Sequence, residues 1–194
     1  MAFTETFTGA DTTSPPNGNW TNHDNGIQLH TNAAAAVSGG SYNFAHYSGG
    51  AFANDQYAFC TYLANTCGPI VRASGTNNCY LLDCNDSGGS TSYIFKRIAG
   101  TLTLLQNLST TFTNGDIARI EITGNTIKCF KNGVQIGTDQ ASGGELTTGS
   151  AGVMCIAASA SLDNWEGGDL GGGPVFVAQP NRRSGQAVKR AAEW

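Results

Sequence analysis

Short runs in which apolar and polar residues alternate make up most of the first 170 residues of the chain. In residues 117–122, Ala118, Ile120 and Ile122 share one face, whereas the charged Arg119 lies on the other. A period of two residues is that of a β-strand with one buried face. The pattern therefore predicts a half-buried strand here.

Two-residue turns separate these runs. Gly124–Asn125 precedes residues 126–131, and Asn132–Gly133 precedes residues 134–138. Gly and Asn adopt positive φ at low cost, which tight hairpin turns require. We therefore predict a series of antiparallel hairpins.

The same analysis gives roughly a dozen short strands and almost no 3.6-residue period, which favours two stacked sheets. We expect Ile120, Ile122 and Trp165 to be buried. Residues 10–19 are predicted to form a loop leading to Trp20, and the small-residue run 33–36 fits more than one structure. The predicted strands are residues 3–7, 26–31, 41–47, 56–63, 68–73, 80–84, 93–98, 101–105, 117–122, 126–131, 134–138, 152–158 and 162–165.

Composition agrees with an all-β domain followed by an arm. Only 12% of the residues are charged and 26 are Gly, as expected of strands joined by many turns. No run approaches the ~20 apolar residues of a membrane helix. The stretch Gly171–Pro174 breaks the pattern. We therefore predict a β-sandwich over residues 1–170 and a short C-terminal arm over residues 171–194.

Charge is distributed unevenly between these two parts. Residues 1–170 hold six Lys and Arg against thirteen Asp and Glu, whereas residues 171–194 hold four against one. A basic arm on an acidic body indicates either contact with an acidic neighbour or a solvated tail. Four cations without interleaved aromatic residues are few for nucleic acid, so a protein partner is favoured. The predicted partner-binding residues are Val175, Phe176, Val177, Arg182, Arg183, Lys189, Arg190 and Trp194.

The six cysteines are predicted to be reduced thiols, without a metal. Residues 1–7 alternate like a strand and lack the basic and apolar segments of a signal peptide, so we expect cytoplasmic synthesis. No histidine lies near the cysteines and their spacing matches no zinc motif. No cofactor is expected. The cysteines are Cys60, Cys67, Cys79, Cys84, Cys129 and Cys155.

No catalytic residue is predicted. Asp163, Glu166 and Asp169 straddle two glycines, and on that ground we expect that they do not share one strand face, as a glycosidase acid pair would require. Asp163 is expected to accept hydrogen bonds from loop amides. A calcium site between Glu5 and Asp163 is an alternative, although calcium needs six to eight oxygen ligands and no Asp-rich loop supplies them.

Two groups of residues are candidates for a sugar site, because each combines aromatic rings with polar groups. Alternating aromatic residues in a strand also fit a core. The three histidines, His23, His30 and His46, lack triad partners and are expected in loops or on the surface. The first group is Tyr42, Phe44, His46 and Tyr47, and the second is Trp20, Asn22 and His23.

An ordered set of short motifs extends from Phe3 to about Leu170. It comprises residues 3–7, 10–11, 18–20, 54–58, 68–72, 78–80, 95–100, 104–105, 114–116, 132–134, 149–152 and 163–169. In this order the motifs resemble the concanavalin A-like (laminin-G-like) jelly-roll domain of bacteriophage and phage-derived proteins. The resemblance implies a two-sheet antiparallel jelly-roll sandwich and leaves the function open.

Two functions are predicted on this basis. The first is a non-enzymatic virion structural protein, which decorates the capsid or caps a tail or fibre and is anchored through its arm to other virion proteins. It would be homo-oligomeric in the particle and made in the host cytoplasm. The alternative is a lectin-like module that binds a surface glycan during host attachment. Neither a membrane nor nucleic acid is an expected partner.

Overall fold

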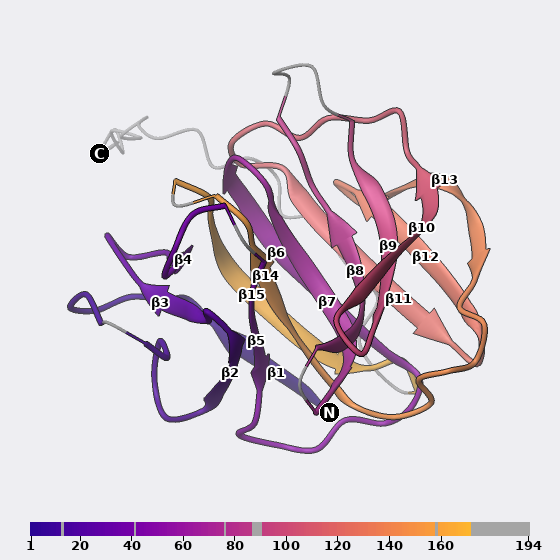
Figure 1. Cartoon of the computed structure of the whole chain (residues 1–194), viewed down its shortest axis with the longest axis horizontal. Helices are drawn as coiled ribbons and strands as arrows, with labels where there is room; N and C mark the ends of the chain where they lie inside the picture. The colour runs from indigo at the N-terminus through magenta and orange to yellow at the C-terminus, as the bar shows by residue number, and fades with distance from the viewer. Residues whose placement is uncertain (13, 41, 76, 87–90, 158, 172–194) are drawn as a thin grey trace, which may run out of the picture.

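Two antiparallel β-sheets lie face to face in the computed structural model of the chain (Figure 1). The structure describes residues 1–12, 14–40, 42–75, 77–86, 91–157 and 159–171. The eight-stranded sheet has the order β13-β12-β11-β6-β15-β4-β3, with β1 also paired to β15. The seven-stranded sheet has the order β10-β9-β8-β7-β14-β5-β2.

The strands of the eight-stranded sheet are β1 (Ala2–Glu5), β3 (Ile27–Leu29), β4 (Ala34–Ala36), β6 (Gln56–Ala64), β11 (Ile117–Thr123), β12 (Thr126–Lys131), β13 (Val134–Ala141) and β15 (Ser161–Asp169). Those of the seven-stranded sheet are β2 (Trp20–Asp24), β5 (Asn43–Tyr47), β7 (Cys67–Ser74), β8 (Asn78–Asp83), β9 (Tyr93–Ile98), β10 (Thr101–Asn107) and β14 (Ser150–Cys155).

This architecture confirms the predicted all-β, two-sheet jelly-roll sandwich. No helix occurs in the part of the chain that the structure describes, and therefore none there is long and apolar enough to cross a membrane. The residues that were predicted as the arm's contacts lie outside the described residues. The chain also forms a strand that the sequence analysis missed, β2, which begins at Trp20.

The main core lies between the two sheets and is built from the alternating apolar faces. Ile120 and Ile122 are 0% exposed and Trp165 is 1% exposed, as predicted. The Trp165 indole N–H donates to the Gly152 carbonyl oxygen at 3.1 Å, so its one polar atom is satisfied inside the core. Burial of this apolar surface is the main stabilising contribution to the sandwich.

All six cysteines are free thiols and buried. Cys67 pairs with Cys84 on one side and with Cys155 on the other, so three thiols lie in one row across neighbouring strands. Burial raises the pKa of Cys60, Cys67 and Cys84 well above the usual thiol value. These thiols therefore pack as small apolar groups.

The C-terminal strand β15 departs from one prediction. Asp163 lies opposite Thr61 and Glu166 opposite Phe59, and both partners belong to the outward face of β6. The prediction that Asp163, Glu166 and Asp169 do not share a face was wrong for Asp163 and Glu166, whereas Asp169 lies opposite Gln56 on the other face of the strand. A bulge at Asn164, whose φ is +47°, inserts the extra residue that brings Glu166 back to the same face.

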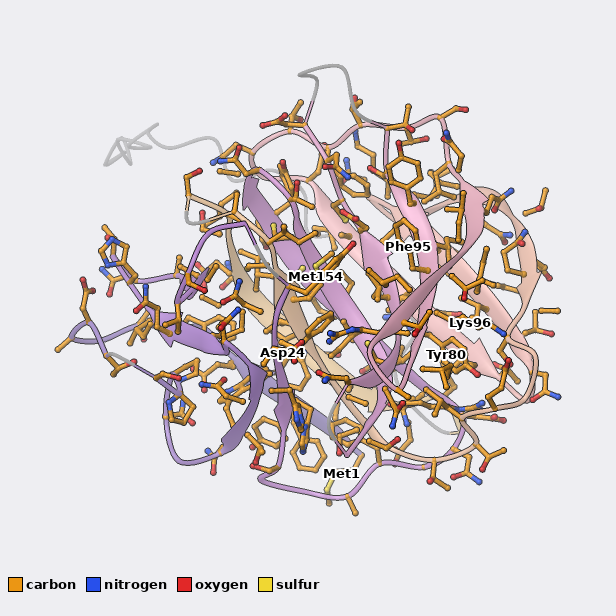
Figure 2. All side chains as sticks on the ribbon, in the orientation of Figure 1. Met1, Asp24, Tyr80, Phe95, Lys96 and Met154 are labelled. Atoms are coloured by element: carbon orange, nitrogen blue, oxygen red, sulfur yellow. The ribbon has the colours of Figure 1, made fainter. Side chains whose placement is uncertain are left out.

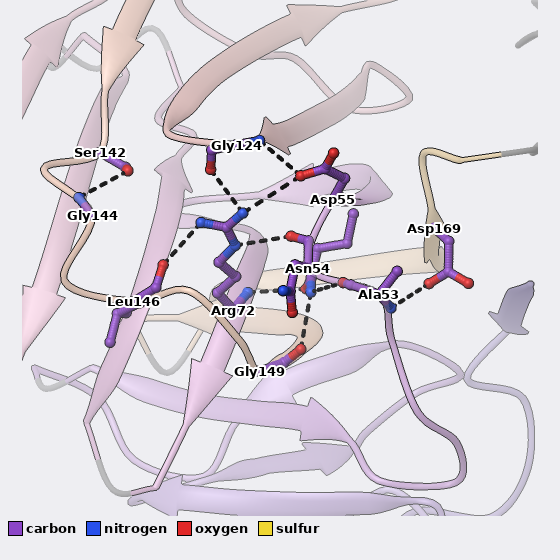
Figure 3. Close-up of polar contacts among 11 residues, drawn as sticks. Ala53, Asn54, Asp55, Arg72, Gly124, Ser142, Gly144, Leu146, Gly149 and Asp169 are labelled. Carbon is purple, nitrogen blue, oxygen red and sulfur yellow. Dashed lines mark hydrogen bonds and ion pairs between the residues drawn. The ribbon is translucent and has the colours of Figure 1, made fainter.

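A buried arginine connects the loops at one end of the sandwich (Figure 3). Arg72 is 2% exposed, and its guanidinium donates to the carbonyl oxygens of Asn54 at 2.9 Å, Leu146 at 2.9 Å and Gly124 at 2.8 Å. Asp55 lies 3.8 Å from the same group. One cation thus satisfies backbone acceptors from three separate loops.

Arg72 also belongs to a bulge in β7. Its φ is +50°, and the pairing of β7 with β8 shifts between Val71 and Ser74. Arg72 therefore points into the sandwich, and Ala73 lies on the opposite, outward face of the seven-stranded sheet, where it packs with Ile70 and Cys79. The bulge therefore connects the loops that Arg72 binds with the outward face of the seven-stranded sheet.

Candidate functional site

The outward face of the seven-stranded sheet brings the two sugar-site candidate groups together. Strands β2 and β5 are paired, so that His23 lies opposite Phe44 and Thr21 opposite His46. Members of both groups therefore form one surface. Sequence reasoning missed this pairing because residues 20–24 were not assigned to any strand.

Three residues of these groups do not belong to the surface. Trp20 is 3% exposed and packs against Trp165 with ring centroids 4.8 Å apart. Tyr47 stacks on Trp165 at 5.4 Å. Both aromatic side chains fill the space between the sheets, which is the core role that alternating aromatic residues also allow. Asn22 lies opposite the core residue Ala45, and its side-chain amide exchanges hydrogen bonds with the backbone of Ile27 at 3.0 and 3.1 Å.

An aromatic stack capped by an arginine marks the surface. Tyr42 and Phe44 are stacked, with ring centroids 5.5 Å apart and an interplanar angle of 9°. The Arg97 guanidinium carbon lies 4.6 Å from the centre of the Phe44 ring and 5.9 Å from that of Tyr42. Such contacts attract the cation to the ring faces and hold the three side chains in place.

Hydrogen bonds fix the guanidinium further. Arg97 donates to Asp24 Oδ2 at 2.5 Å and to Asn77 Oδ1 at 3.0 Å. Its Nε donates to the Gly100 carbonyl oxygen at 3.4 Å. Arg97 lies on β9 and Asp24 on β2, towards opposite edges of the seven-stranded sheet. The ion pair therefore connects the two sides of the outward face.

An open hollow of about 620 Å³ lies beside the stack. It is lined by Asp24, Asn25, Gly40, Tyr42 and Arg97. A narrow cleft adjoins it on the other side of Arg97, lined partly by His23, Asn77 and Asn78. The combination of a half-buried ring with amide, carboxylate and guanidinium groups suits a ligand with both apolar and hydroxyl-bearing faces.

A second apolar cluster forms the floor of this face. It contains Phe44, Ile70, Ala73, Cys79, Leu81 and Met154, with Tyr42, Phe95, Leu102 and Ile156 packed at its edge. Asp24, Met154 and Phe95 are labelled in Figure 2, and all three belong to strands of the seven-stranded sheet. The floor is buried and closely packed, so it holds the polar groups above it in a fixed arrangement.

Two of the three histidines belong to this face, where they lie half-buried in strands β2 and β5 rather than in loops. His23 and His46 stack at 4.7 Å, and His23 Nε2 lies 2.5 Å from His46 Nδ1. Burial lowers the pKa of both rings, and the neighbouring His23 helps to lower that of His46 to about 4. The pair is therefore neutral at pH 7. His30 is exposed, as predicted, and contacts Asp11 at 2.9 Å.

A buried carboxyl group lies at one end of the same face. Burial raises the pKa of Asp83 to about 7, and a hydrogen bond from Asn85 Nδ2 at 2.9 Å opposes the rise. Burial also raises the pKa of Tyr42 to about 12, with a contribution from Asp83. The Tyr42 phenol is therefore neutral and can donate or accept a hydrogen bond.

The carboxylates that resembled an acid pair lie on the eight-stranded sheet, away from this hollow. Glu166 Oε1 accepts a hydrogen bond from the Tyr57 hydroxyl at 2.6 Å. Asp163 accepts from the amide of its neighbour Asn164 at 2.7 Å, a contact within strand β15 rather than with the loop amides that we predicted. Burial and the charge of Glu5 raise the pKa of Asp163. Asp169 holds the N-terminal ammonium group of Met1 at 2.8 Å.

A metal ion has no obvious position among these groups. In the ranges that the structure describes, no three His, Cys, Asp or Glu side chains are grouped so as to hold one. Glu5, the proposed calcium partner of Asp163, accepts hydrogen bonds from the Phe7 amide at 3.1 Å and the Asn17 side chain at 2.6 Å. Its carboxylate is therefore already used within the loop.

Comparison with known proteins identifies the fold. The sequence matches no protein-family model and no curated protein. The structure is similar to the carbohydrate-binding module CBM66 from Bacillus subtilis, with a TM-score of 0.65 and 16% identity over 76% of this chain and 94% of that one.

Two further solved structures are similar. The exoplasmic/lumenal domain of VIP36, in its Ca²⁺- and Man2-bound form, has a TM-score of 0.55 and 11% identity over 90% of this chain and 89% of that one. A β-glucanase from Bacillus licheniformis has a TM-score of 0.52 and 13% identity over 87% and 97% of the two chains.

The chain thus has the concanavalin A-like jelly-roll fold that carbohydrate-binding modules, lectin-type domains and some glycan hydrolases share. The predicted fold is confirmed. The matched structures named here carry no link to bacteriophages, so that part of the resemblance stays a prediction.

Proposed function

We propose that this protein is a non-enzymatic, glycan-binding module, and that its ligand lies in the hollow beside Tyr42 and Arg97. One observation carries the proposal. A half-buried aromatic stack borders a hollow whose remaining lining, Asp24, Asn25 and Arg97, offers both donors and acceptors to sugar hydroxyls. The C–H face of a sugar ring packs on an aromatic ring, while its hydroxyls need such polar partners.

The arrangement supports binding without hydrolysis. Glycosidases of both stereochemical types use a pair of carboxyl groups on either side of the scissile bond. Among the described residues that line this hollow, Asp24 is the single carboxylate, and it is held by Arg97 at 2.5 Å. A paired carboxylate of this kind holds a hydroxyl group well and is poorly placed to transfer protons.

Binding to a panel of immobilised oligosaccharides tests the proposal. We expect wild-type protein to bind at least one of them and Tyr42→Ala to lose at least tenfold in affinity. Tyr93→Ala is the matched control, because Tyr93 is a half-buried tyrosine of the same sheet that contacts Phe95 at 5.6 Å but does not line the hollow. Equal losses in both variants, or no binding by the wild type, would contradict the proposal.

A role as a virion structural protein is a second, more specific proposal, and no described residue supports it directly. It rests on the basic arm and on the resemblance to phage jelly-roll domains. The glycan-binding proposal fits with it, because an attachment module can be carried on a particle. Its partners, the virion proteins and further copies of this chain, stay predictions.

A further inference from the structure

The charge of Arg97 is paired with a carboxylate within the protein. Its side chain is 10% exposed, and the carboxylate of Asp24 lies 2.5 Å from it. Asn77 and the Gly100 carbonyl take further donors, and the ring of Phe44 covers one face. An anionic ligand would have to displace Asp24 to reach the guanidinium, and would lose a partly buried ion pair in doing so.

The backbone holds Asp24 in this position. Asp24 ends β2 with φ at +53°, a conformation that Asp and Asn adopt more readily than most residues. It lies opposite Asn43 in the pairing of β2 with β5. Its side chain is 23% exposed, so one edge of the carboxylate faces the hollow.

We propose that Asp24 determines the specificity of this site: as the counter-charge to Arg97, it restricts the ligand to uncharged glycans and excludes those that carry carboxylate or sulfate groups. This inference rests on the glycan-binding function proposed above. The Asp24 carboxylate would repel acidic sugars, because their carboxylate or sulfate groups also carry negative charge.

The other titratable groups of this face add no positive charge. His23, on β2, also faces Asp24 and Arg97, and its lowered pKa keeps it neutral at pH 7. His46 on β5 is neutral for the same reason. Asp83 on β8 contributes negative charge when it ionises near pH 7. Residues 1–170 hold seven more acidic than basic residues, so the field of the domain also repels anions.

Matched neutral and acidic glycans test this inference. The probes are β-1,4-linked mannan oligomers against β-1,4-linked oligomannuronates, titrated at low and high salt. Wild-type protein should bind a neutral member at least tenfold more tightly than its acidic partner. Asp24→Asn removes the counter-charge, keeps the shape and suits the positive φ. We expect it to raise the ratio of acidic to neutral affinity at least tenfold, in a salt-sensitive way.

Asp139→Asn is the control, since Asp139 pairs with Lys128 at 3.4 Å on the other sheet and changes the net charge equally. Its affinity ratio should equal that of the wild type. A wild type that prefers the acidic glycans, or an Asp24→Asn variant that folds and keeps the wild-type ratio, overturns the inference and leaves glycan binding standing. A wild type that binds neither these probes nor any other oligosaccharide of the panel overturns the proposed function, and the inference with it.

Discussion

At the scale of the residue, buried polar groups decide how this sandwich responds to its surroundings. Asp83 and the His23–His46 pair are the main titratable groups beneath the candidate site, and burial shifts all three toward their neutral forms. Their effects on stability have opposite signs. A carboxyl group whose pKa is raised stabilises the fold at low pH, and a histidine whose pKa is lowered stabilises it at high pH.

Substitution of Asp83 by Asn separates these effects. The unfolded chain ionises this group near its ordinary pKa of 3.8, and the folded chain only near 7. The contribution of Asp83 is therefore complete below pH 3.8 and lost as the pH rises to about 7. Relative to wild type, Asp83→Asn should gain up to about 4 kcal/mol of unfolding free energy across this interval.

Urea unfolding of both proteins from pH 4 to pH 8.5 measures this difference. The histidines contribute equally to both proteins and cancel. The difference should grow between pH 4 and pH 7 and become constant above about pH 8. A difference that does not depend on pH would show that Asp83 is ionised in the folded protein.

At the scale of the element, bulges determine which residues reach which face. The alternating pattern was sufficient to predict most strands, including residues 93–98 and 126–131 with their observed bounds. It failed at Asn164 and at Arg72, where a single residue with positive φ shifts the register. Local sequence does not reveal such shifts, because they depend on the pairing with the next strand.

The site was predictable only in part for the same reason. Tyr42, Phe44, His46 and His23, the candidates that reach the surface, were identified from their residue types. These residues lie on one surface because β2 pairs with β5. Arg97 lies on β9, which is distant from both strands in the sequence. Long-range contacts of this kind are set by the curvature of the whole sheet, which no short pattern contains.

Arg72→Ala should destabilise the fold strongly. The substitution leaves the carbonyl oxygens of Asn54, Gly124 and Leu146 without their shared donor inside the protein. We expect a loss of roughly 3–5 kcal/mol. Lys128→Ala removes an exposed cation instead and should cost less than about 1 kcal/mol.

Chemical denaturation at pH 7 compares the two variants. Guanidinium ions at millimolar concentration, added to Arg72→Ala, should recover part of the lost stability by entering the vacated position. Equal stabilities of the two variants would show that solvent reaches these carbonyl groups and that the arginine does not hold the loops together.

At the scale of the whole molecule, the sandwich and the arm are expected to act separately. Among the described residues, two apolar clusters already cover both faces of the seven-stranded sheet. Deletion of residues 172–194 should therefore change the melting temperature by no more than a few degrees and leave glycan affinity unchanged. If the arm anchors the protein to a particle, the truncated protein should fail to attach, whereas high salt should weaken attachment of the full chain.

Melting curves, glycan titration and co-sedimentation with the particle together test this division. Loss of folding or of glycan affinity on truncation would show that the arm is part of the domain. Normal attachment of the truncated protein would remove the anchoring role and leave the glycan-binding proposal as it stands.

The central claim is that the hollow beside Tyr42 and Arg97 holds the sugar, and mapping amide chemical shifts during titration with the tightest oligosaccharide of the panel tests it most directly. The account predicts shifts centred on Asn25, Tyr42, Asn77 and Arg97, with little change on the eight-stranded sheet. Shifts centred instead on Phe59 and Glu166 of that sheet would contradict it.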